Sequence, residues 1–231
     1  MSDKSPTNEE REGSDTPDLQ YLLQGAEAFS RSVFPDSEAL FKSLAHRQTP
    51  HTLFITCADS RVSPEMITQT RPGELFVCRN IGNIVPAYGE MLGGVSAVVE
   101  FAVLALNVKQ IVICGHSDCS AMKGLTSGAS LAEEMPTVHA WLRNAEAARS
   151  VVMARKLEEE CIVQAMVEEN IRLQLTHLRT HPAVAGRLAQ KQQLQVQGWV
   201  YDIGYGQVSV FDENAGVFES IPEARLRMQQ K

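Results

Sequence analysis

The sequence predicts an α/β fold: a mainly parallel central sheet with helices on both faces and an antiparallel edge strand. Unbroken apolar runs within 51–56, 74–78 and 110–114 are typical of strands buried on both faces. Segments with helical spacing separate these runs, and strands that alternate with helices form parallel sheets. A hairpin predicted from 193–203 and 207–211 supplies the antiparallel edge.

Two regions precede the first strand. Residues 1–17 are almost entirely polar, so we expect a disordered tail, and residues 18–231 are expected to form a single domain. Apolar side chains recur at helical spacing from Leu19 to Val33, and Pro35-Asp36-Ser37 then offers a break and a cap for a second helix through Leu44. The pattern predicts two amphipathic helices.

The remaining helices follow from turn residues and apolar spacing. Gly93-Gly94 opens an apolar helix that ends at Leu106 and completes a right-handed βαβ crossover. Further helices are predicted from Pro64, from Ser117 to about Lys123, from Pro136 to about Val152, from Cys161 to Thr180 and from Ala224 to Lys231.

Composition narrows the class of protein. Lys+Arg 21 against Asp+Glu 28 gives 21 − 28 = −7, and this surplus of acid argues against nucleic acid or an anionic membrane as a partner. No apolar run has the length of a membrane span, and the first residues are too polar for a signal peptide. Five cysteines without disulfide-scaffold density suit a reducing compartment. We therefore expect a soluble, cytoplasmic protein.

Metal-binding residues follow two of the predicted strands. Cys57 comes directly after one strand, and His116 and Cys119 come after another. Ligands bind outside the carboxyl ends of strands in open α/β sheets, so these three side chains are expected to meet. A single free cysteine is often only a small buried hydrophobe, but the combination predicts one zinc site.

The number of ligands bears on the role of the metal. Structural zinc sites usually have four protein ligands, whereas catalytic sites have three and keep one position for water. No fourth cysteine or histidine lies beside these motifs, although Asp59 could reach the metal. Cys78 and Cys114 lie within apolar strands, and Cys161 lies in a helix, so none of these three is given a chemical role.

Asp59 and Arg61 are two residues apart, so in an extended segment they face the same side and form an ion pair that keeps the carboxylate charged. A solvated loop salt bridge of little consequence is the alternative. The pair directly follows a predicted ligand, which favours a role for Asp59 in orienting a hydroxide formed at the zinc.

The motifs together resemble those of the β-class carbonic anhydrases, most closely the plant-type bacterial members, including those that accompany cyanase. The resemblance implies zinc-dependent, reversible hydration of carbon dioxide to bicarbonate and a proton, with Cys57, His116 and Cys119 as ligands. It also implies an Asp59–Arg61 dyad that positions the hydroxide, and N-terminal helices that clasp a partner subunit in a homodimer or higher homo-oligomer. The matching segments are Cys57–Val62, Pro72–Val77, Arg79–Asn83, Gly115–Cys119 and Gly198–Asp202.

The resemblance extends to a substrate pocket, with two departures from the family pattern. Phe101 stands where plant-type relatives usually have tyrosine, and Ser120 replaces the usual glycine after the last ligand. Phe54 stands where members with an inhibitory bicarbonate site tend to have tryptophan, so that regulation is not expected. The pocket residues implied are Gln48, Phe76, Ile81, Gly94 and Phe101.

Three other functions remain open from the sequence. The same site could hydrolyse carbon disulfide or carbonyl sulfide, as some relatives do. The zinc could be structural in an interaction module, or Cys57 and Cys119 could form a redox pair. No motif identifies the residue that carries the proton to solvent. Four histidines outside the predicted zinc site are expected to be surface or helix residues: His51, His139, His177 and His181.

Overall fold

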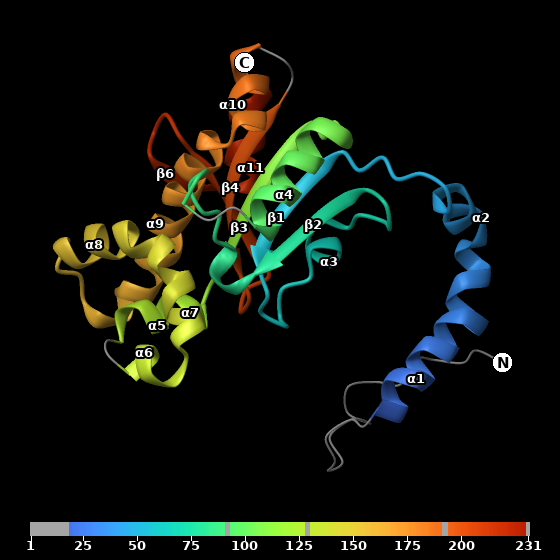
Figure 1. Cartoon of the computed structure of the whole chain (residues 1–231), viewed down its shortest axis with the longest axis horizontal. Helices are drawn as coiled ribbons and strands as arrows, with labels where there is room; N and C mark the ends of the chain where they lie inside the picture. Colours follow the sequence, from blue (N-terminus) through green and yellow to red (C-terminus); the bar gives the residue numbers. More distant parts are fainter. Residues whose placement is uncertain (1–18, 91–92, 128–129, 191–193, 230–231) are drawn as a thin grey trace. The chain divides into compact units, whose positions relative to one another are not determined.

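A computed structural model describes residues 19–90, 93–127, 130–190 and 194–229 (Figure 1). The expected tail 1–17 lies outside these residues. The chain divides into two compact units, residues 1–47 and residues 48–231. Within the described ranges, no helix is both long and apolar enough to cross a membrane.

The described part of the first unit is a helix without the break predicted at 35–37. It consists of α1 (Leu19–Ala28), the π-helical turn η2 (Phe29–Val33) and α2 (Phe34–Leu44), and the joining residues keep helical dihedral angles. Proline has no N–H to give to the carbonyl of the preceding turn. The wider π-turn, in which the Phe34 N–H bonds to the Phe29 carbonyl, accommodates Pro35 and lets the helix continue.

This first unit leaves its apolar side chains uncovered. None of the residues in its helices is buried, and Leu19 and Leu22 are 70% and 65% exposed. The rings of Phe29, Phe34 and Phe41 contact one another, with centroids 5.6 to 6.3 Å apart. The amphipathic character predicted from the sequence is therefore present, and residues 19–47 provide no partner for the apolar face.

The second unit is built on a six-stranded sheet with the order β2-β1-β3-β4-β5-β6. The first four strands in this order pair in parallel, and the β4–β5 and β5–β6 pairings are antiparallel, which confirms the mainly parallel sheet with an antiparallel edge. The sixth strand was not predicted, because its four residues are too short to show a period. The bounds are β1 (Thr52–Cys57), β2 (Leu75–Asn80), β3 (Gln110–His116), β4 (Gln195–Asp202), β5 (Gln207–Asp212) and β6 (Val217–Ser220).

The helices of this unit largely follow the predicted order. The elements are α3 (Pro64–Thr68), η3 (Ile81–Asn83), α4 (Gly94–Glu100), η4 (Phe101–Ala105), α5 (Ser120–Thr126), α6 (Ser130–Glu134), α7 (Pro136–Leu142), η5 (Arg143–Ala145), α8 (Glu146–Ala154), α9 (Glu159–Thr180), α10 (Pro182–Ala189) and α11 (Ile221–Gln229). The predicted helix 136–152 is interrupted at η5, and α5 begins at Ser120 because Cys119 is still extended. The helices α6 and α10 were not predicted.

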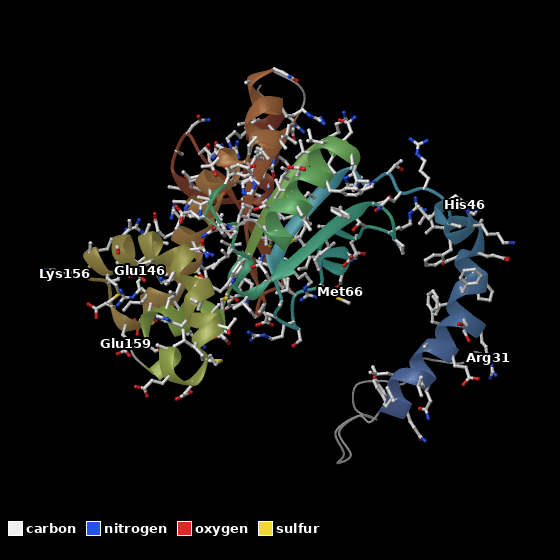
Figure 2. All side chains as sticks on the ribbon, viewed as in Figure 1. Arg31, His46, Met66, Glu146, Lys156 and Glu159 are labelled. Carbon is white, nitrogen blue, oxygen red and sulfur yellow. The ribbon has the colours of Figure 1, made fainter. Side chains whose placement is uncertain are left out.

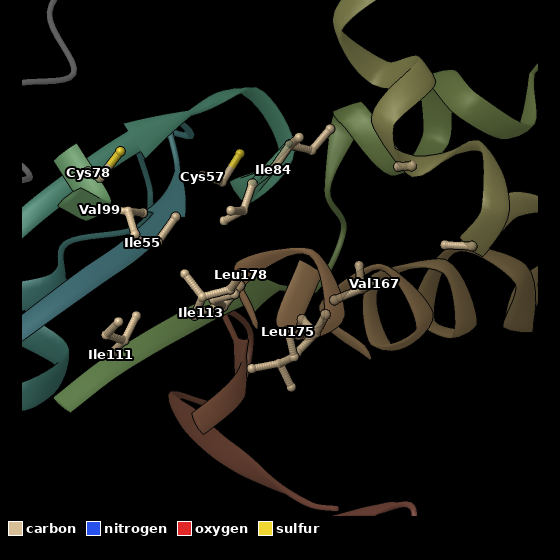
Figure 3. Packing of buried hydrophobic residues seen from close by; sticks show 14 of the residues in the cluster. Ile55, Cys57, Cys78, Ile84, Val99, Ile111, Ile113, Val167, Leu175 and Leu178 are labelled. Carbon is tan, nitrogen blue, oxygen red and sulfur yellow. The ribbon is translucent and has the colours of Figure 1, made fainter. Parts of the chain in front are cut away.

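The main core lies between the helices and one face of the sheet. Side chains alternate along a strand, so Leu53 and Ile55 join Ile111 and Ile113 on this face, while Phe54 points to the other. Figure 3 shows Leu178 of α9 beside Ile113 of β3. The opposite face carries a smaller cluster of strand residues: Phe54, Val112 and Cys114 with Leu75, Val77, Trp199 and Tyr201.

Two glycines let α9 lie close to the sheet. A Cβ atom on Gly198 of β4 would lie 2.5 Å from Ile171 Cγ2 and 3.0 Å from Leu175 Cδ1. A Cβ atom on Gly115 of β3 would lie 3.1 Å from both Val167 and Ile171. The small residues therefore set the separation of the helix from the strands.

Charged side chains occupy the outer surface beyond this core. Figure 2 shows Glu146, Lys156 and Glu159 projecting from α8, from the following turn and from the start of α9. All three are exposed, so the α8–α9 hairpin combines a buried apolar side with a solvated charged side.

Candidate metal centre and active site

The sheet brings the three predicted ligands together. Cys57 and His116 are the last residues of β1 and β3, which are hydrogen-bonded neighbours in the sheet. Between His116 and the start of α5, Asp118 adopts the left-handed conformation at φ 57°, and Cys119 then precedes the helix. The ligand atoms of Cys57, His116 and Cys119 all lie within 4.8 Å of one another, and all three residues are buried.

The imidazole of His116 is oriented as a metal ligand. Its Nδ1 lies 2.8 Å from the Ser117 carbonyl oxygen, which can only accept, so Nδ1 carries the proton. Nε2 then holds a lone pair, and this buried atom has no hydrogen-bond partner among the described residues. A buried acceptor without a partner is costly, and a cation between the two sulfurs would satisfy it.

The two neighbouring cysteines have opposite pKa shifts. The Cys119 side chain, against the effect of burial, lowers the pKa of Cys57 to about 4. The interaction with Cys57, together with burial, raises the pKa of Cys119 well above its ordinary range. A bound cation would favour deprotonation of both thiols, which is how such sites couple metal binding to proton release.

Asp59 and Arg61 form a bidentate ion pair beside the ligands. Asp59 Oδ1 accepts from the Arg61 backbone N–H at 2.9 Å and from Nε at 3.0 Å, and Oδ2 accepts from Nη2 at 2.9 Å. These bonds hold the pKa of the Asp59 carboxyl well below its usual range. Asp59 Oδ2 also lies 3.8 Å from His116 Nε2, so the charged carboxylate borders the proposed metal position.

Two residues that sequence reasoning missed hold this loop from either side. Arg79 at the end of β2 donates to the Cys57 carbonyl at 3.1 Å and to the Asp59 carbonyl at 2.6 Å. Asp118 Oδ2 accepts from Arg61 Nη1 at 3.3 Å, and its other oxygen pairs with Lys123. Only the position of Arg79 directly after a strand, and of Asp118 beside a ligand, could have indicated these contacts.

An apolar cavity of about 280 Å³ adjoins the cluster at Cys57. Cys57 and Asp59 form its polar side, and Ile81 is the predicted pocket residue that lines it. Ser120, the departure noted above, also lies in its wall, at the start of α5. The other lining residues are Ala58, Ala121, Gly124, Leu131, Met135, Val138 and Leu142.

The other four predicted pocket residues do not line this cavity. Phe76 pairs with Leu53, four residues before Cys57 on β1, which is about 13 Å along a strand. The Phe76 ring contacts Phe101, with centroids 5.9 Å apart, and Gln48 precedes β1 altogether. Gly94, at the start of α4, is likewise absent from the lining. Within one chain the structure does not bring Gln48, Phe76, Gly94 and Phe101 to the ligands.

The remaining cysteines lie apart from the cluster. Burial raises the pKa of the Cys78 thiol and raises that of Cys114 to about 12, as expected for cysteines that serve as core. Cys161 is exposed near the start of α9. None of the three joins the group formed by the candidate ligands.

A family model described as carbonic anhydrase matches residues 52–208, the segment from β1 into β5 that carries both strand-end motifs. The chain belongs to the carbonic anhydrase family. It is 49% identical over 206 residues to a carbonic anhydrase of Pseudomonas aeruginosa (strain PAO1), covering 89% of this chain and 93% of that protein. It is 50% identical to carbonic anhydrase 1 of Escherichia coli O157:H7, covering 84% and 88%.

Solved structures place it in the β class of these enzymes. The structure of the β-carbonic anhydrase CcaA is 44% identical with a TM-score of 0.85, and the match covers 87% of this chain and 98% of that one. A tetrameric β-carbonic anhydrase of Sordaria macrospora is 29% identical with a TM-score of 0.75, covering 83% and 95%. The reaction of this carbonic anhydrase is therefore the reversible hydration of carbon dioxide, and the buried Cys-His-Cys group fits its centre.

Proposed function

We propose that Cys57, His116 and Cys119 hold one catalytic zinc ion and that Asp59, fixed by Arg61, orients the attacking water. The observation that carries this proposal is the unpartnered Nε2 of His116, buried beside the two cysteines. A zinc ion held there supplies Lewis acidity that makes water a nucleophile at neutral pH. Within the described residues the cluster has three members, which favours the open fourth position of a catalytic site over a structural one.

The chain's own groups account for orientation and selectivity. Because Arg61 keeps Asp59 ionised, the carboxylate can only accept a hydrogen bond from the attacking water. That bond fixes one O–H and leaves an oxygen lone pair free to face the substrate. The apolar cavity walled by Ile81 suits carbon dioxide, which has no charge, better than it suits the bicarbonate product.

We further propose that the enzyme is a homodimer or higher homo-oligomer and that a second copy completes the substrate pocket. Gln48, Phe76, Gly94 and Phe101 lie outside the cavity of their own chain, so they reach a pocket only across an interface. Phe101 is 48% exposed, and the helices of the first unit have uncovered apolar side chains, as surfaces buried by association do. The Sordaria macrospora relative is tetrameric.

A cytoplasmic location completes the proposal. All five cysteines are free thiols in the structure, including the exposed Cys161. A reducing compartment preserves thiols in this state and keeps Cys57 and Cys119 available for metal.

Metal analysis and stopped-flow hydration of carbon dioxide on the same preparations test the site. We expect about one zinc per chain. Cys57→Ser, His116→Ala and Cys119→Ser should each lose zinc and activity, because each removes one of three ligands. Cys161→Ser is the matched control and should keep both. Full zinc occupancy in the three ligand variants would refute the assignment, and product analysis with carbonyl sulfide and carbon disulfide tests the other substrates.

A further inference from the structure

The turn η3 links the metal centre to the rest of the protein. It follows Asn80, the residue of β2 that pairs with Cys57, and its first residue, Ile81, lines the cavity. Gly82 and Asn83 adopt left-handed conformations at φ 76° and 47°. A turn of this kind lacks the ladder of bonds that holds a strand, so its backbone groups need other partners.

Two buried amides of α9 supply partners for this turn and the residues after it. Asn170 Nδ2 donates to the Gly82 carbonyl at 3.0 Å, and Gln174 Oε1 accepts from the Val85 N–H at 2.9 Å. The two side chains are four residues apart on one helical face, and Gln174 Nε2 donates to Asn170 Oδ1 at 2.8 Å. Asn170 is 1% exposed and Gln174 is 0% exposed. Both amides are thus fixed in orientation by each other.

Other contacts hold the same turn as well. Trp141 Nε1 donates to the Ile81 carbonyl at 2.8 Å. The side chain of Asn80 accepts from the Ile84 N–H at 2.7 Å and donates to the Ile84 carbonyl at 2.9 Å. A Cβ atom on Gly82 would lie 3.1 Å from Met122 Cε, so α5 closes the remaining space. The turn therefore has little freedom to move relative to Cys57.

We propose that Asn170 and Gln174 are positioning residues for the metal centre, acting through the turn Ile81–Asn83. The turn directly follows Asn80, which pairs with Cys57 and whose carbonyl accepts from the Ala58 N–H at 2.8 Å, and it places Ile81 in the same cavity wall as Cys57. Hydrogen bonds that orient a ligand from outside the coordination sphere affect metal affinity strongly, and here they reach Cys57 through its strand partner Asn80. This inference rests on the proposed zinc site.

The alternative role is a purely structural one, in which the amides only satisfy buried backbone groups and anchor α9. Both roles predict a loss of stability when an amide is removed. They differ at the metal, because an anchoring role changes neither the affinity of the folded protein for zinc nor the environment of the thiolates. The test therefore reads the metal directly.

The variants are Asn170→Leu and Gln174→Met, which keep side-chain size and remove the polar atoms. We expect zinc affinity, measured by competition with a chelator, to fall about 10-fold to 100-fold. The thiolate-to-metal charge-transfer absorption of the cobalt-substituted protein should shift as well. Leu175→Ala is the matched control on the same helix: it lies in the core facing Gly198, so it should lower stability and leave affinity and spectrum unchanged.

Wild-type affinity and spectrum in both amide variants would overturn the proposal. If either variant fails to fold, Trp141→Phe tests whether the turn controls the metal centre, because it removes the hydrogen bond to the Ile81 carbonyl and keeps an aromatic ring at this partly exposed position. We expect affinity to fall about 3-fold to 10-fold, the scale of one hydrogen bond, and no change would count against the turn. A wild-type protein without zinc would instead refute the proposed site, so the two failures are distinguishable.

Discussion

The two ends of β1 differ in how completely one chain builds them. At the carboxyl end, Cys57 meets His116 and Cys119, and the loop after it is held by Arg61 and Arg79. At the amino end, Phe76 pairs with Leu53 and its ring contacts Phe101, Gln48 precedes the strand, and none of these three predicted pocket residues lines the cavity at Cys57. Parallel pairing within one chain is sufficient to bring side chains from the carboxyl ends of neighbouring strands together. The proposed function therefore assigns the candidate metal centre to one chain and the rest of the proposed pocket to the assembly.

Deleting the first helices should have the largest effect on this difference. We expect a chain truncated through Leu44 to lose assembly and to lose activity by about 100-fold or more, because misplaced pocket residues are costly. Its zinc should remain, since the ligands lie at the other end of the strand. Sedimentation, zinc analysis and hydration rates measure the three properties. Removal of residues 1–17 is the control and should change none of them. A fully active truncated monomer would contradict the comparison.

A smaller loss is expected from Asp59→Asn, which alters the carboxyl end without removing a ligand. Zinc content should stay near normal, and hydration should slow by about 10-fold to 100-fold, because the amide loses the charge that pairs with Arg61 and can donate toward the attacking water. Asp118→Asn, which leaves the Asp59–Arg61 pair in place, is the matched control. An unchanged rate would reduce the pair to a loop salt bridge, and loss of zinc would show that Asp59 supports the ligands themselves.

The smallest expected effect is the pH dependence of protein stability, which arises from two histidines that contact the residues following the turn Ile81–Asn83. Burial lowers the pKa of His177 and His181, whose rings bond to the Val85 and Pro86 carbonyls. Their folded pKa values lie below the unfolded value of about 6.5, so stability is full above that pH and falls as the pH drops through it.

Urea unfolding from pH 7 to pH 5 measures this loss. One proton limits it to about 1.4 kcal/mol per pH unit for each histidine. His181→Gln keeps a donor for the Pro86 carbonyl and should flatten the slope. Equal slopes in the variant and the wild-type protein would contradict the assignment.

Much of the carboxyl end could be predicted because its signals are local. Apolar runs that end in Cys57 and near His116 indicated both the strands and their shared edge, and the spacing of Asp59 and Arg61 predicted their ion pair. Parallel pairing then brought distant motifs together without further information. The ligand, catalytic and pocket roles themselves stay predictions.

Other features could not be read because their cause is tertiary. Asn170 and Gln174 have the helical spacing of any polar pair, and nothing nearby in the sequence shows that they meet Gly82 and Val85, which lie 88 and 89 residues earlier. Pro35 indicated a break in the helix, but a π-helical turn before it lets the helix continue. The pocket residues were identified by resemblance alone, and a single chain has no local signal for what a second copy contributes.

The glycines beneath α9 are positions at which a substitution far from the proposed metal centre would affect it. A methyl group on Gly198 would lie too close to Ile171, so alanine there would displace this side chain or the helix, whereas alanine at Gly115 requires a smaller shift of Ile171 and Val167. Asn170 adjoins Ile171 and would move with it. A conservative substitution on the sheet, with no contact to any proposed ligand, would thereby disturb the hydrogen bond from Asn170 to the Gly82 carbonyl and, through the turn, the position of Cys57. Screens for variants with lower activity or lower zinc content should recover such substitutions.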